Sequence, residues 1–260
     1  MRVVPGLVLA LLVLVVQPFR AASAKGVQPF RADSAITPPV RAASTRQPRS
    51  QRITLRTEDG VTIAATWYEP SIRPAPAVIL VHMLSRSRRE WDGFASQLAS
   101  EGVGALAIDL RGHGESQGDA GGDLATMLKD VQAARQHLAV RPDVVRTRIG
   151  IAGASLGANL AVLAAADDSS IVSLALLSPS LDYRGLRSEA AMRKYGSRPA
   201  LLAFSDDDAY ANRSAKDLQK AGAGIRELLA LNGAGHGTTM LSRSADLSRA
   251  LVDWFRRTLQ

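Results

Sequence analysis

No cysteine occurs anywhere in the 260 residues. Disulfide bonds, lipidation at a cysteine and a cysteine nucleophile are therefore all excluded. The absence of cysteine is compatible with export from the cell, but it does not by itself indicate export.

The body of the chain has no excess of charge of either sign. Of the 32 basic and 24 acidic side chains, residues 1–56 hold nine basic ones and a single acid, Asp33. Residues 57–260 therefore carry 23 of each, and the net charge of +8 belongs wholly to the N-terminal quarter. A body without a positive field argues against nucleic-acid binding.

The N-terminus has no apolar run long enough to span a membrane. The run from Val3 to Val16 is about 14 residues, whereas a spanning helix needs roughly 20. It follows an early Arg2 and precedes a small-residue "ASA" that ends at Ala24. This order is typical of a secretory signal peptide, so we expect residues 1–24 to direct export to the periplasm or the medium and to be cleaved near Ala24. The alternative is an uncleaved N-terminal membrane anchor.

Residues 25–50 are rich in Ala, Ser, Pro, Gln and Arg and contain almost no large apolar side chains. Such a composition buries too little surface to offset chain entropy, which predicts a disordered basic linker. Two interpretations stay open: a merely solvated linker, or a weak electrostatic attachment to anionic envelope polymers or lipid headgroups.

Residues 51–260 alternate strand and helix patterns. Two alternating segments, 52–57 and 61–67, flank "EDG" and predict an antiparallel hairpin. Apolar runs typical of parallel strands covered on both faces then recur, and helix-period segments separate them, as at 123–138 and 247–255. We therefore predict one catalytic domain with an α/β fold: a mostly parallel central sheet of about eight strands, the N-terminal hairpin, and helices on both faces.

Chemistry in such sheets lies beyond the carboxyl ends of the strands. There the sequence places Ser155 after the run 149–154, the acids "DDD" after 200–205, and His236 after 226–232. A serine, an acid and a histidine are thus expected at one edge of the sheet.

Ser155 lies within "GASLG", where a strand turns directly into a helix. Such a corner forces a positive φ, and glycines two places on either side avoid a steric clash across the turn. The helix N-terminus places amide N–H groups beside the serine hydroxyl. An unassisted serine is a poor nucleophile, so His236 is the natural base and Asp208 the residue that orients it.

With these motifs the chain resembles the serine hydrolases of the α/β-hydrolase superfamily over residues 53–260. The resemblance rests on the G-x-S-x-G segment 153–157, the "DLRGHGES" loop 109–116, and the late Asp and His. It implies a Ser-Asp-His triad that acts on esters, or less often on amides, thioesters or related bonds, with no metal and no organic cofactor. The expected substrate is a small-molecule or polymer-borne ester.

The resemblance also bears on which His and Asp take part. It assigns His82 a structural role, while His113 and His137 are expected to be structural or exposed, which leaves His236 as the base. The family's spacing selects Asp208, with Asp207 next. Asp206 is the third member of that run, and Asp182 is an outside candidate.

The oxyanion hole needs two N–H donors. One is expected from Leu156 and the other from Leu84, with Met83 as the alternative. Met83 stands where the family commonly has glycine, so either the loop takes an ordinary conformation or the donor geometry differs. Met83, Leu84 and Tyr183 are the expected substrate contacts, with Leu156 beside them.

Two further features leave alternatives open. Three arginines, Arg86, Arg88 and Arg89, either grip an anionic substrate or form a solvated helix start. Only some twenty residues follow Ser178 before the next strand, which permits one short helix and predicts an open site without a lid domain. A thioesterase, a peptidase, a perhydrolase, or a catalytically silent envelope-tethered binding module remain the alternatives to an exported esterase. The oligomeric state is not predicted.

Overall fold

The computed structural model describes residues 48–260. The predicted signal peptide and residues 25–47 of the predicted linker lie outside the described residues. The first strand begins at Ser50, beside the predicted domain boundary at residue 51.

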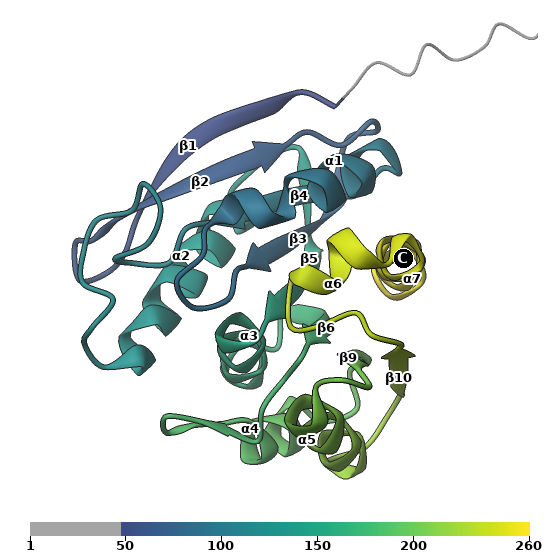
Figure 1. Ribbon diagram of the computed structural model, residues 1–260. Helices are drawn as coiled ribbons and strands as arrows, with labels where there is room; N and C mark the ends of the chain where they lie inside the picture. Colours follow the sequence, from purple (N-terminus) through teal and green to yellow (C-terminus); the bar gives the residue numbers. More distant parts are fainter. Residues whose placement is uncertain (1–47) are drawn as a thin grey trace, which may run out of the picture. The chain divides into compact units, whose positions relative to one another are not determined.

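Eight strands form the main sheet, which confirms the predicted number (Figure 1). They run in the spatial order β1-β2-β4-β3-β5-β6-β9-β10. The antiparallel pairs are β1–β2 and β2–β4, and every other neighbouring pair is parallel. The strands are β1 (Ser50–Arg56), β2 (Thr62–Tyr68), β3 (Ala75–Val81), β4 (Gly104–Ile108), β5 (Val144–Ala154), β6 (Ile171–Leu177), β9 (Ala200–Ser205) and β10 (Arg226–Leu231).

Helices cover both faces of the sheet, as predicted (Figure 1). One apolar core contains buried side chains of four helices, α2 (Leu128–Ala139), α3 (Leu156–Asp167), α4 (Ser188–Tyr195) and α5 (Ala209–Lys220). The other contains those of α1 (Asp92–Ser100), α6 (Thr239–Arg243) and α7 (Ala245–Thr258). No helix within residues 48–260 is long and apolar enough to cross a membrane.

The helical periodicity identified the buried faces correctly. The predicted segment 123–138 is a 3₁₀ turn, η2 (Leu124–Met127), followed by α2. The side chains of its predicted apolar face are buried or half-buried: Leu124, Met127, Leu128, Val131 and Leu138. The apolar face predicted at the C-terminus is buried in α7, whose Trp254 indole donates to the carbonyl of Leu174 at 2.9 Å. The buried faces of α2 and α7 thus pack against opposite faces of the sheet.

The segment between β6 and β9 holds the expected short helix, α4, and no lid domain. It also contains a small hairpin that the sequence pattern did not predict, formed by β7 (Asp182–Tyr183) and β8 (Leu186–Arg187). Two-residue strands are too short to show a hydrophobic period.

Candidate active site

The turn from β5 into α3 places Ser155 at a strained corner. Its backbone has φ 50° and ψ −115°, and its side chain is half-buried. A Cβ on Gly153 would lie 2.1 Å from the carbonyl oxygen of Gly157, and a Cβ on Gly157 would lie 2.3 Å from the carbonyl oxygen of Val81. Both clashes involve backbone atoms, so only glycine fits these two positions.

His236 and Asp208 meet beyond the ends of β9 and β10. His236 Nδ1 lies 2.5 Å from Asp208 Oδ2, and the other carboxylate oxygen of Asp208 accepts a hydrogen bond from the Ala211 amide at 3.1 Å. The second contact caps α5 and fixes the direction of the carboxylate. Because the carboxylate accepts at Nδ1, the neutral imidazole keeps Nε2 as its acceptor. The His236 side chain is 51% exposed and that of Asp208 only 16%.

The other acidic candidates lie elsewhere. Asp206 accepts from the Gly233 amide at 2.7 Å and Asp207 from the Gly235 amide at 3.1 Å, so both contact the loop that carries His236 rather than its ring. Asp182 lies in the β7–β8 hairpin and accepts from the Gly185 amide at 2.7 Å. Among the four aspartates considered, Asp208 is the one that the geometry pairs with the imidazole.

The loop after β3 takes an ordinary conformation at Met83. The positive φ in this loop is at Ser85, 61°, and Met83 is not among the residues with positive φ. The Met83 side chain is nearly fully buried, and its sulfur would lie 2.7 Å from a Cβ on Gly237. Met83 therefore packs beneath the histidine loop.

His82 holds this loop in place as a neutral imidazole. Its Nε2 accepts from the Leu110 amide at 2.9 Å, so Nδ1 carries the proton and donates to the Met83 carbonyl at 2.7 Å. Burial of the ring lowers the pKa of His82 to about 4. His113 lies beside it, with ring centroids 5.1 Å apart, and its Nδ1 is 2.9 Å from the Arg111 carbonyl oxygen.

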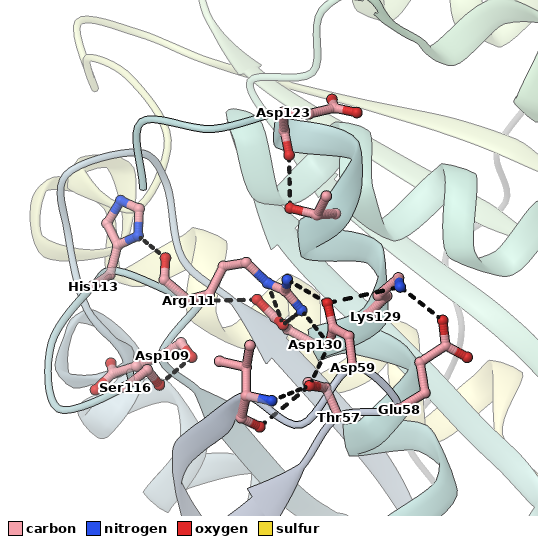
Figure 2. Close-up of polar contacts among 12 residues, drawn as sticks. Thr57, Glu58, Asp59, Asp109, Arg111, His113, Ser116, Asp123, Lys129 and Asp130 are labelled. Atoms are coloured by element: carbon pink, nitrogen blue, oxygen red, sulfur yellow. Dashed lines mark hydrogen bonds and ion pairs between the residues drawn. The ribbon is translucent and has the colours of Figure 1, made fainter. Parts of the chain in front are cut away.

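The "DLRGHGES" loop is a hydrogen-bonded frame (Figure 2). Arg111 forms ion pairs with buried Asp130 and with Asp59 of the β1–β2 turn, and Lys129 pairs with Asp59 and Glu58. The hydrogen bond from Arg111 lowers the pKa of Asp59. The loop is thereby joined to the first hairpin and to α2.

At the other end of this frame, Asp109 organises the segment after β3. Its buried carboxylate pairs with Arg88 and accepts from the Glu115 amide at 2.8 Å. A Cβ on Gly114 would lie 2.1 Å from the same carboxylate, which explains the glycine there.

Of the three arginines in the run after β3, Arg88 is therefore structural. It is 2% exposed and also pairs with Glu115 at 2.8 Å. Arg89 pairs with the same Glu115 at 3.0 Å, and exposed Arg86 lies 3.5 Å from Glu90. Each of the three has a carboxylate partner within the domain.

Three contacts at the site were missed by the sequence analysis. Buried Asn159 of α3 donates to the carbonyls of Ser180 and Leu186 at 3.0 and 2.9 Å, and it accepts from Ser180, which anchors the β7–β8 hairpin. Ser178 Oγ accepts from the Gly237 amide at 2.9 Å. The signal that could have revealed the first contact is an asparagine inside the apolar helix sequence "ANLAVLAAA".

The third of these contacts joins the segment after β3 to the histidine loop. Glu90, in the 3₁₀ turn η1 (Arg88–Trp91), accepts from the Thr238 hydroxyl at 2.7 Å. Burial raises the pKa of Glu90. Nothing in the sequence pattern linked these two residues.

The remaining predicted residues pack against one apolar core. Leu156 is fully buried as the first residue of α3, and Leu84 and Tyr183 are half-buried and pack against the same core. His137 lies in the last turn of α2, before the predicted triad residues in the sequence. Burial lowers the pKa of His137. Within residues 48–260, no group of three or more His, Cys, Asp or Glu side chains is arranged to hold a metal ion.

Comparisons with known proteins indicate a hydrolase family and an α/β-hydrolase fold. A family model described as serine aminopeptidase, S33, matches residues 72–198. An uncharacterised protein of Mycobacterium tuberculosis is 32% identical over 126 residues, which cover 48% of this chain and 44% of that protein. The chain thus spans less than half the length of the curated relatives it matches first.

Solved structures share the whole domain architecture. The dienelactone hydrolase of Anabaena variabilis has a TM-score of 0.71 at 18% identity, covering 83% of this chain and all of that one. Est1E of Butyrivibrio proteoclasticus, solved with bound ferulic acid, has a TM-score of 0.70 at 20% identity, covering 79% of this chain and 98% of that one. At these identities the likeness establishes the fold.

Proposed function

Because the chain belongs to the α/β-hydrolase superfamily, we propose that it is a serine hydrolase that cleaves carboxylic esters through an acyl-enzyme. The observation that carries the proposal is the strained Ser155 between two obligatory glycines, together with the His236–Asp208 pair at the same edge of the sheet. A half-buried serine held at φ 50° costs stability without improving packing, as expected of a functional residue.

In the proposed reaction, Ser155 Oγ attacks the acyl carbon while His236 Nε2 takes the hydroxyl proton. Asp208 holds Nδ1 and stabilises the imidazolium that forms. The imidazolium then protonates the leaving alcohol as the acyl–oxygen bond breaks. Water, deprotonated by His236, hydrolyses the acyl-enzyme and restores Ser155.

We propose Leu156 as the first donor to the oxyanion. It is the first residue of α3, and the N–H groups of a first helical turn have no intrahelical acceptor. The α3 dipole also favours negative charge at that point.

Peptide geometry favours Leu84 over Met83 as the second donor. In a trans peptide the N–H points opposite to the preceding C=O. The His82 carbonyl oxygen lies close to Gly157 at the start of α3, so the Met83 N–H points away from that helix. The Met83 carbonyl faces the buried His82 ring, so the Leu84 N–H points away from this buried ring.

For the acyl group we propose Leu84 and Tyr183 as direct contacts and Met83 as the floor beneath the histidine loop. The short β6–β9 segment supports an open site that accepts small-molecule or polymer-borne esters. The S33 family match supports a second candidate, an aminopeptidase that uses the same residues. We further propose, from sequence alone, that residues 1–24 direct export and that the segment from residue 25 up to the start of β1 forms a basic tether.

The test is turnover of p-nitrophenyl esters of increasing acyl length, and of aminoacyl p-nitroanilides, by wild type and Ser155→Ala. We expect ester turnover by wild type and a loss of roughly 10⁴-fold or more in the variant, as for other triad serines. Ser242→Ala removes an exposed hydroxyl in α6 and should leave turnover unchanged. Absence of both turnover and labelling by a fluorophosphonate in wild type would overturn the proposal, and faster anilide than ester turnover would select the aminopeptidase.

A further inference from the structure

The loop that carries His236 is built from residues with little conformational preference. In "NGAGHG" (232–237), Gly233, Gly235 and Gly237 have φ values of 56°, 80° and 59°. A loop with three glycines loses much backbone entropy on ordering. A base that must act on one atom therefore needs contacts that fix this loop from outside.

Four consecutive side chains of the β9–α5 turn supply such contacts. Ser205 Oγ accepts from the Ala234 amide at 2.7 Å, and Asp208 binds the His236 ring at 2.5 Å. Between them, Asp206 and Asp207 accept from the amides of Gly233 and Gly235, at 2.7 and 3.1 Å. Residues 205–208 thus hold residues 233–236 one for one.

The pairing of the two strands brings these two segments side by side. Ser205 lies opposite Leu231 at the end of the parallel β9–β10 pair, and the Asp206 amide donates to the Leu231 carbonyl at 2.9 Å. The turn therefore leaves the sheet beside the loop. Hydrogen bonds from the Ser205 hydroxyl and the Gly235 amide lower the pKa of Asp207, which keeps this acceptor ionised.

We infer that Asp206 and Asp207 are positioning residues, an aspartate clamp that orders residues 232–237 and so aims His236 at Ser155. The effect on turnover rests on the proposed hydrolase function, whereas the ordering of the loop does not. The clamp acts through its acceptor oxygens. Asparagine keeps one acceptor oxygen and should therefore preserve the ordering of the loop, whereas alanine has none and should lose it.

The experiment compares Asp206→Ala/Asp207→Ala with Asp206→Asn/Asp207→Asn in the full chain. Asp119→Ala is the matched control, because Asp119 also accepts from a glycine amide, that of Gly121 at 2.8 Å, in an exposed loop away from His236 in the sequence. Two readouts are taken on each folded variant: hydrogen exchange of the peptide containing residues 232–238, and kcat and KM for the best p-nitrophenyl ester.

We expect the alanine pair to lose exchange protection in residues 232–238 and to lower kcat by about 30- to 100-fold, with KM within about threefold, as for a base displaced by about 1 Å. The asparagine pair should restore both readouts, and Asp119→Ala should change neither. Wild-type exchange in the alanine pair would overturn the clamp, and so would an asparagine pair as impaired as the alanine pair.

The two proposals fail in different ways. If wild type shows neither turnover nor fluorophosphonate labelling, the hydrolase proposal fails, and hydrogen exchange alone decides whether the clamp orders the loop. If wild type turns over and the alanine pair exchanges faster but keeps its kcat, the loop is ordered by the clamp without aiming the base, and the positioning role is overturned.

Discussion

The two edges of the parallel sheet are built differently. At the carboxyl edge, three neighbouring strands, β3, β5 and β6, are each followed by a serine in the left-handed region: Ser85 at φ 61°, Ser155 at 50° and Ser178 at 48°. Short side chains and glycines bring the loops at this edge close together. Strained backbone of this kind persists only where the surrounding structure holds it in place.

At the amino edge, arginines satisfy backbone carbonyls. Arg198 donates to the carbonyls of Ala165, Asp168, Ile171 and Tyr195 at 2.6–2.9 Å, so one guanidinium closes the ends of α3 and α4. Arg226 donates to the carbonyls of Gly196 and Arg198. Backbone strain is thus concentrated at the carboxyl edge, where we propose the active site. Hydrogen bonds from arginine side chains stabilise the amino edge.

Gly157→Ala is expected to have the largest effect, because it overcrowds the strained edge. The new Cβ would meet the carbonyl oxygens of Val81 and His82 at 2.3 and 2.7 Å, and neither backbone can move freely. We expect a loss of roughly 3 kcal/mol in the free energy of unfolding and at least about 10³-fold in turnover.

The control for this substitution is Gly93→Ala in α1, where the added Cβ meets nothing within 4 Å. Its turnover should equal that of wild type. Both variants are assayed together. If Gly157→Ala turned over substrate at the wild-type rate, the carboxyl edge would tolerate crowding, and the proposed difference between the two edges would be wrong.

Acid should weaken the carboxyl edge through His82. The folded chain keeps this imidazole neutral down to a pKa of about 4, whereas the unfolded chain takes up the proton near 6.5. The unfolded state thus binds more protons between these values, so stability falls as pH drops from about 6.5 to about 4, by roughly 3 kcal/mol in total.

Urea unfolding at intervals across this range measures the effect. The variant His82→Gln should be less stable at pH 7 and should show a pH dependence shallower by one proton. An unchanged slope in the variant would mean that other groups carry the acid sensitivity.

Arg198→Met should have the smallest of the three effects and should separate stability from catalysis. Losing hydrogen bonds to four carbonyls should cost roughly 2 kcal/mol in unfolding free energy. Because the contacts lie at the amino edge, kcat should stay within about twofold of wild type. Arg193→Met, which removes an exposed arginine paired with Glu189 within α4, is the control and should cost under about 1 kcal/mol. A fall in kcat with unchanged stability would contradict the division between the edges.

Much of the fold was predictable because of how its strands are covered. Strands buried on both faces read as continuous apolar runs, and each run ended at a residue that the structure places at the carboxyl edge. The hairpin β7–β8 and the start of β5 at Val144 were not predictable in this way, since "VVRTR" and "DY" show no apolar run. The local sequence pattern does not predict a strand whose conformation is set by hydrogen bonding to a neighbouring strand.

The candidate site was predictable by residue type and spacing but not by contact. The types of Ser155 and His236, and their positions after strands, pointed to the carboxyl edge of the sheet. In the structure they follow β5 and β10, which run parallel in that sheet. The adjacent acids Asp206 and Asp207 read as a solvated turn, because their partners are amides 27 and 28 residues away that only the β9–β10 pairing brings near. Met83 was ambiguous because the sequence alone does not show which residue of this loop has a positive φ; in the structure it is Ser85.

The one-for-one match between residues 205–208 and 233–236 has a consequence for anyone who wishes to transplant this machinery. A single insertion or deletion within either segment would change the spacing between these contacts and separate His236 from Asp208. The two segments therefore form one exchangeable unit, and a chimaera that grafts the histidine loop without its turn should retain the sheet and lose the alignment.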